Sequence, residues 1–202
     1  MLFRKKKNLI FIFLSGLLFS VFFVLPAAAG EAVRVDEMAV INAERDLLLY
    51  FSVKNSFSAE MEEGVKNGIP VSFNFFVELY PVHQGREGGK IAGHSFDHTM
   101  VYDSLKEEFT VELEEHGSMS LSFQSLEEAR KAMDTIHDFR LAELSRLAKG
   151  SDYVVKVRAR LAKKTLPLNF QYIIPFWQLW KFETDWNALT FTYGNSAPAT
   201  QR

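Results

Sequence analysis

The stretch VSFNFFVEL, residues 71–79, carries an apolar side chain at every second position. A period of two indicates a β-strand, because successive side chains of a strand point to opposite faces of its sheet. The intervening positions include Phe76, so the second face is partly apolar as well. We therefore expect a central strand whose first face is buried in the core.

A second strand with the same period is predicted at residues 153–161, where Lys156, Arg158 and Arg160 form a basic, solvated face. We expect its apolar face to share one core with the first strand. The side chains expected to be buried together are Phe73, Phe75, Val77, Val155 and Val157. Shorter β-rich or alternating segments predict further strands at 33–41, 47–53, 90–103, 109–113, 119–123 and 189–193.

One helix is predicted between the strands expected at 47–53 and 71–79. Ser58 is a suitable N-cap, and acidic residues follow it in the first turn over 59–67. Gly68 can adopt the left-handed conformation that ends a helix. A short helix over 59–67 is therefore expected.

A second helix is predicted to begin at a capping box, in which Ser125 and Glu128 satisfy each other's end of the backbone. We expect it to run to about Ile136, followed by another short helical patch over 141–148. Many strands at short spacing, with two or three short helices, predict an α+β fold. We expect it to be predominantly antiparallel β, with a sandwich-like sheet, after an N-terminal signal segment.

Residues 1–30 have the three-part plan of a secretory signal. Basic residues from Arg4 to Lys7 precede an apolar run, and Ala27-Ala28-Ala29 follows Pro26 as a cleavage box. We expect a signal peptide over 1–30, a single α+β domain over 31–194 and a flexible tail over 195–202. The alternative is an uncleaved leader that anchors the domain in the membrane. Either way, the domain is expected in the periplasm or on the extracytoplasmic face.

Charge and cysteine content exclude several classes of function. The whole chain has a formal net charge of −2, and it has no cysteine. Without the four basic residues from Arg4 to Lys7, 19 basic and 25 acidic residues remain, a formal charge of −6. Such a domain repels phosphate backbones, so no nucleic-acid partner is expected. Disulfides, thiolate catalysis and cysteine-type zinc sites are excluded.

Several short strings occur in a familiar order and spacing. They are NGIP at 67–70, VYDSL at 101–105, YVVKVR at 153–158, LP at 166–167, FQ at 170–171 and WKFETDW at 180–186. The ordered set resembles a bacterial family of exported proteins, domain of unknown function 4390, over residues 33–193. The resemblance implies an exported domain without a known activity. Because such proteins are often encoded beside membrane sensor kinases, it also implies a membrane sensor as one partner. The chain departs from the family in having Tyr80-Pro81-Val82-His83 where an arginine-rich pair is common.

The densest group of candidate metal ligands is His94 and His98, with Asp97 and Asp103 nearby. On a strand the two histidines share a face but lie about 13 Å apart, and two ligands alone make an incomplete zinc site. The favoured interpretation is therefore a polar strand face, with no metal or other cofactor. Paired glutamates recur along the chain, but adjacent residues of a strand point to opposite faces rather than across a cleft. No catalytic residue is predicted, because no nucleophile elbow, phosphate loop or zinc-protease motif is present.

All three tryptophans lie in one aromatic segment, at positions 177, 180 and 186. If the segment is extended, Trp180 and Trp186 share one face, and we expect both to be buried and to hold the last strand on the core. Trp177 is then expected to point outward. Trp177 and its neighbour Phe176 are the candidate ligand-binding residues, as an aromatic platform.

These observations predict a non-catalytic binding or accessory module of the cell envelope. Its expected partner is an envelope protein, such as a membrane sensor, or a wall polymer, and it meets the membrane only through an uncleaved leader. The alternative is an envelope hydrolase whose catalytic residues come together only in the folded chain. Clustered polar side chains with shifted pKa values would favour the hydrolase.

Overall fold

The computed structural model describes residues 31–162, 182–194 and 199–200. The strands are β1 (Arg34–Ala43), β2 (Asp46–Lys54), β3 (Val71–His83), β4 (Arg86–Glu87), β5 (Ala92–Asp103), β6 (Glu108–Leu113), β7 (Met119–Phe123), β8 (Thr135–Glu143), β9 (Asp152–Leu161), β10 (Asn187–Thr192) and β11 (Ala199–Thr200). The helices are α2 (Ala59–Lys66) and α3 (Leu126–Asp134), with 3-10 turns η2 (Glu114–His116) and η3 (Leu144–Arg146). The described chain is therefore mostly β-structure with two short α-helices, as the alternation predicts.

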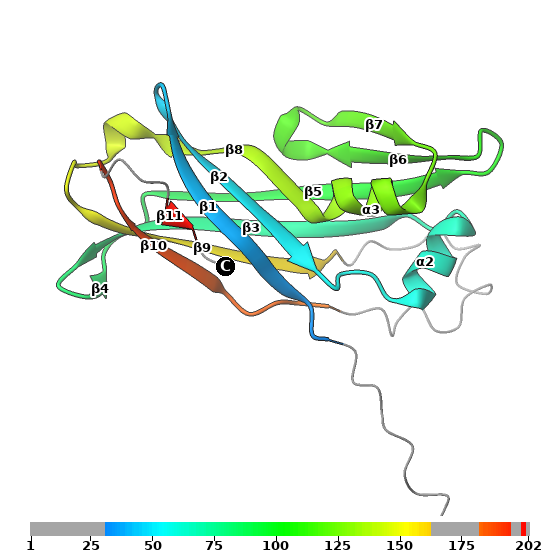
Figure 1. The fold of residues 1–202 in the computed structure, drawn as a ribbon, viewed down its shortest axis with the longest axis horizontal. Coiled ribbons are helices and arrows are strands. Elements are labelled where there is room, and N and C mark those ends of the chain that lie inside the picture. The colour runs from blue at the N-terminus through cyan, green and yellow to red at the C-terminus, as the bar shows by residue number, and fades with distance from the viewer. Residues whose placement is uncertain (1–30, 163–181, 195–198, 201–202) are drawn as a thin grey trace, which may run out of the picture. The chain divides into compact units, whose positions relative to one another are not determined.

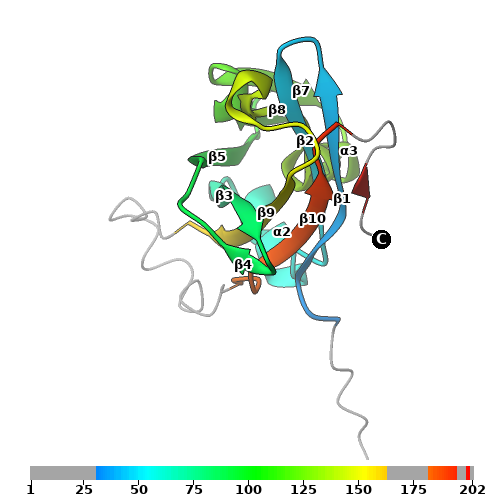
Figure 2. The same ribbon diagram turned by 90° about the vertical axis from the view of Figure 1, so that its left-hand side faces the viewer.

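The strands form two antiparallel sheets that pack on each other (Figures 1 and 2). One sheet has the order β11-β1-β2-β8, and the other has the order β10-β9-β3-β5-β6-β7, with β4 paired to β3. The ring of Phe51, on β2, lies edge-on to that of Phe75, on β3, with 5.8 Å between the ring centroids. This contact joins the inner faces of the two sheets, so the predicted sandwich-like α+β fold is confirmed.

Strand β3 is central, as its alternation predicts. It pairs with β5 on one side and with β9 on the other. The five side chains expected to be buried together are all fully buried: Phe73, Phe75, Val77, Val155 and Val157. The apolar faces of β3 and β9 lie side by side because Val77 pairs with Val157 in the register of the two strands.

The two helix starts follow their capping residues. Ser58 accepts a hydrogen bond from the Met61 N–H at the start of α2. Gly68, which follows α2, has the left-handed φ of 82° that only glycine adopts without strain. At α3, the Ser125 hydroxyl accepts from the Glu128 N–H and donates to the Glu128 carboxylate. Both helices therefore begin at the predicted serine caps, although Glu128 bonds to the Ser125 hydroxyl and not to its backbone.

The predicted helical patch over 141–148 is wrong, and α3 ends two residues earlier than Ile136. Ile136 and Leu141 belong to β8, which pairs with β2, and only η3 has a helical turn in this region. Both side chains are fully buried between the sheets. The long-range pairing and this burial outweigh the weak local helix propensity.

The described residues leave some predictions untested. The predicted signal peptide at 1–30 lies outside them. Within the segment expected to be a flexible tail, Ala199 and Thr200 pair with Val40 and Ala39 of β1. Neither described helix has the length and apolarity needed to span a membrane.

Candidate functional site

The outward face of β3 and β9 carries an unusual mixture of aromatic and basic side chains. Phe76 interrupts the polar positions of β3, and it pairs with Arg158 of β9 in the strand register. Arg160 follows two residues later on the same face, and Trp186 lies just before β10. We call Phe76, Arg158, Arg160 and Trp186 the arginine–aromatic row.

Both arginines of the row lie over aromatic rings. The guanidinium carbon of Arg158 is 5.2 Å from the Phe76 ring centroid and 4.9 Å from the Trp186 ring. The guanidinium carbon of Arg160 is 4.6 Å from the Phe76 centroid. Such cation–π contacts are worth about 0.5–1 kcal/mol each at exposed sites. They place both guanidinium groups over aromatic rings of the outward face.

The two arginines differ in their polar partners. Arg158 Nη1 lies 3.1 Å from Glu183 Oε1, and its Nε is buried without a hydrogen-bond partner among the described residues. Arg160 Nε donates to the neutral amide oxygen of Asn74 at 3.3 Å. Among the described residues, no carboxylate forms a salt bridge with the Arg160 side chain, which is solvent-exposed, so its charge is available to an anion.

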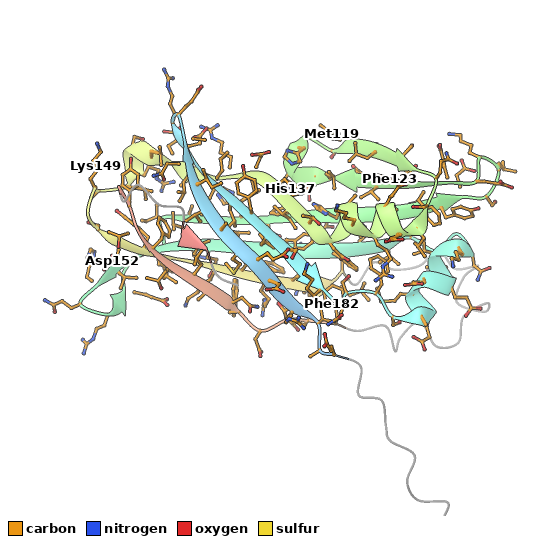
Figure 3. All side chains as sticks on the ribbon, in the orientation of Figure 1. Met119, Phe123, His137, Lys149, Asp152 and Phe182 are labelled. Atoms are coloured by element: carbon orange, nitrogen blue, oxygen red, sulfur yellow. The ribbon has the colours of Figure 1, made fainter. Side chains whose placement is uncertain are left out.

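The expectation that Trp186 is buried is wrong, because its side chain is 40% exposed. In the backbone pairing with β9, Glu183 lies opposite Arg160, whereas Asn187 lies opposite Val157. The four residue steps from Glu183 to Asn187 therefore match only three steps from Arg160 to Val157. The segment before β10 has one extra residue, as in a β-bulge. After the extra residue, odd-numbered rather than even-numbered side chains point inward. Phe182, labelled in Figure 3, still packs against the core and lies edge-on to Phe73 at 4.8 Å between centroids. Trp186 points outward, where it contacts Arg158.

The candidate ligand-binding residues Trp177 and Phe176 lie outside the described residues, as does Trp180. The row was not found from the sequence, although two of its signals were visible there. Phe76 stands among the polar positions of β3, and β9 has a basic face. What the sequence does not show is that β3 and β9 are neighbours in a register that brings these residues together.

The weak alternative of a metal at His94 and His98 gains no third ligand. Among residues 31–162, 182–194 and 199–200, no three acidic or histidine side chains form a group that could hold a metal ion. His94 is exposed, and its Nε2 lies 2.8 Å from the Leu141 carbonyl oxygen. His98 is fully buried and has separate partners of its own.

His98 belongs to a buried polar cluster with Glu115, Asp134 and Ser56. Its Nδ1 lies 3.0 Å from the Met133 carbonyl oxygen, and its Nε2 lies 2.9 Å from Glu115 Oε1. Asp134 follows Met133 in the chain, and its carboxylate accepts a short hydrogen bond from Ser56. Because both ring nitrogens of the buried histidine contact protein oxygens, the ring offers no free nitrogen to a substrate in this conformation.

The pKa values of the two carboxyl groups of this cluster shift in opposite directions, although burial acts to raise both. Desolvation by burial raises the pKa of Asp134 to about 7, although Ser56, Arg130 and His98 all oppose the rise. Desolvation also acts to raise the pKa of Glu115, but the hydrogen bond and the charge of His98 hold that pKa below its ordinary value. Ionisation of Asp134 in this buried cluster is therefore expected to lower the free energy of unfolding.

The model of the family described as Domain of unknown function (DUF4390) matches residues 30–190. The chain belongs to this family. The match covers β1 to β9 and the first four residues of β10, together with the arginine–aromatic row and the buried polar cluster. Comparison with curated proteins and with solved structures finds no match.

Proposed function

We propose that this chain is an exported, non-catalytic binding module of the cell envelope, and that the arginine–aromatic row is its binding face. The observation that carries the proposal is that the Arg158 guanidinium contacts the rings of both Phe76 and Trp186, beside Arg160, which forms no salt bridge with a described carboxylate. An exposed tryptophan next to oriented arginines is typical of recognition surfaces.

The chemistry of the row favours a ligand with both anionic groups and flat apolar surface. Guanidinium groups bind carboxylates through paired hydrogen bonds, and an indole ring packs on apolar faces while its N–H donates. An anionic wall polymer combines carboxylates with sugar rings, whose C–H faces stack on tryptophan. We therefore propose a carboxylate-bearing wall polymer as the ligand, in preference to an envelope protein such as a membrane sensor.

Export is the first testable part of this proposal. The cleavage box at Ala27-Ala28-Ala29 predicts a mature chain that begins at Gly30 or Glu31. N-terminal sequencing of the envelope form from cells is the measurement. Recovery of the intact Met1 end in the membrane fraction would show instead that the leader is an anchor.

Binding to purified cell-wall sacculi tests the row itself. We expect Trp186→Ala and Arg160→Gln each to weaken co-sedimentation of the mature domain with sacculi by about tenfold or more. Because both side chains are exposed, neither change should lower the free energy of unfolding by more than about 1 kcal/mol. Arg140→Gln is the matched control, since it removes an exposed arginine from β8, which lies in the other sheet.

The remaining outcomes separate the alternatives. Equal weakening by Arg140→Gln would show that binding depends only on net charge. It would contradict the proposal that the arginine–aromatic row is a specific binding face. Sacculus binding that is unaffected by both row variants would move the ligand to another surface. Release of soluble wall fragments by the purified wild-type domain would favour the hydrolase instead.

A further inference from the structure

Strand β7 (Met119–Phe123) ends the larger sheet on one side. It pairs with β6 through the register Leu113–Met119 to Phe109–Phe123, and no described strand pairs with its outer edge. Figure 1 shows β7 at the rim, and Figure 3 labels Met119 and Phe123 on it. In an antiparallel pair, backbone N–H and C=O groups alternate between the partner strand and the opposite side. About half of the backbone groups of β7 therefore face away from β6.

This edge lacks several of the usual protections against strand addition. Its sequence, MSLSF, contains neither a charge nor a proline, and its five residues are an ordinary strand length. Met119 is 49% exposed. The strand at the other end of the sheet, β10, contacts β1 and β11 of the second sheet. Of the two end strands of the larger sheet, β10 therefore contacts the second sheet, whereas β7 has no described strand at its outer edge.

The surroundings of the open edge are acidic. Residues 103–131, which contain β6, β7 and the start of α3, carry eight acidic and three basic side chains. Glu112 is exposed and pairs directly with Ser120 of β7. Because strands lie about 4.8 Å apart, a lysine on an added strand opposite Ser120 can reach the Glu112 carboxylate over the small serine.

We propose that β7 accepts an extended, lysine- or arginine-bearing segment of a partner protein as a further antiparallel or parallel strand. Backbone groups of β7 supply the hydrogen bonds, as in β-strand addition. Apolar residues of the added segment pack beside Leu121 and Phe123, and its basic residues lie beside Ser120 and Ser122 on the acidic face. A second copy of this chain is a poor occupant, because it would bring the same acidic surroundings to the edge.

The probe is a peptide of alternating lysine and valine, about seven residues long and blocked at both ends. With the mature domain, we expect binding by fluorescence anisotropy and slowed hydrogen exchange of β7 amides, with unchanged exchange in β10. Ser122→Lys should weaken binding about tenfold, because it places a like charge beside the lysines of the probe. Ser104→Lys is the matched control, since it adds the same charge to the exposed turn between β5 and β6.

Two N-methylated forms of the probe test the backbone contacts. One carries methyl groups on the lysine amides and the other on the valine amides, and only one of these sets faces β7. Loss of binding with one form alone supports strand addition. Binding of both forms like the parent, or equal weakening by Ser122→Lys and Ser104→Lys, would overturn it. Self-association of the mature domain that Ser122→Lys abolishes would also overturn the proposal, in favour of a second copy.

Discussion

Replacement of Phe75 by alanine is expected to lower the free energy of unfolding by about 3–5 kcal/mol, through lost transfer energy and the cavity that remains. The ring is fully buried at the centre of β3. Its centroid lies 5.8 Å from that of Phe51, 5.4 Å from that of Phe96 and 4.8 Å from that of His98. Removing it therefore leaves space between the two sheets and beside the buried polar cluster.

Phe76 provides the matched control for this measurement. It is the next residue of the same strand but lies on the outward face, where it is only half-buried. Denaturant titrations of Phe75→Ala and Phe76→Ala should give a much smaller loss for Phe76. A loss below about 1 kcal/mol for Phe75→Ala would contradict the central position of β3.

Replacement of Asp134 by asparagine is expected to stabilise the domain at pH 8, by at most about 4 kcal/mol, and to have little effect near pH 4. The bound follows because a tenfold change in proton affinity corresponds to about 1.4 kcal/mol, and burial raises the pKa of Asp134 from 3.8 to about 7. Asparagine has no charge to bury, and its amide oxygen can still accept the hydrogen bond from Ser56.

The direction of the pH dependence follows from proton linkage. Between pH 3.8 and about 7 the folded chain holds a proton on Asp134 that the unfolded chain has released. The stability that this proton contributes is complete below pH 3.8 and is lost as the pH rises through about 7. The asparagine variant lacks this loss, so its advantage over the wild type should grow across that interval.

Thermal or denaturant unfolding of both proteins across the pH range checks this expectation. Asp103→Asn is the control, because it removes a carboxylate at the end of β5, where Asp103 accepts hydrogen bonds from the N–H groups of Leu105 and Lys106 in the following turn. An effect of Asp134→Asn that is the same at pH 4 and pH 8 would show that the carboxyl group is not protonated in the folded domain.

The amino-acid sequence by itself determined the features that depend on neighbouring residues. Alternation in 71–79 and 153–161 is sufficient to predict strands and the side chains that they bury, because the period of a strand is local. Serines before acidic turns likewise predict where α2 and α3 begin, since a cap bonds backbone groups only a few residues away. Acidic composition and missing catalytic motifs led to the expectations of no nucleic-acid partner and no catalytic residue, which do not depend on the fold.

Tertiary structure decided everything that depends on which segments meet. Ile136 and Leu141 lie in β8 because β2 pairs with it, and Trp186 points outward because one extra residue separates Glu183 from Asn187 relative to β9. The buried polar cluster joins Ser56, His98, Glu115 and Asp134, which the sequence holds far apart. Long-range pairing and burial set these positions, and neither has a period that can be recognised along the chain.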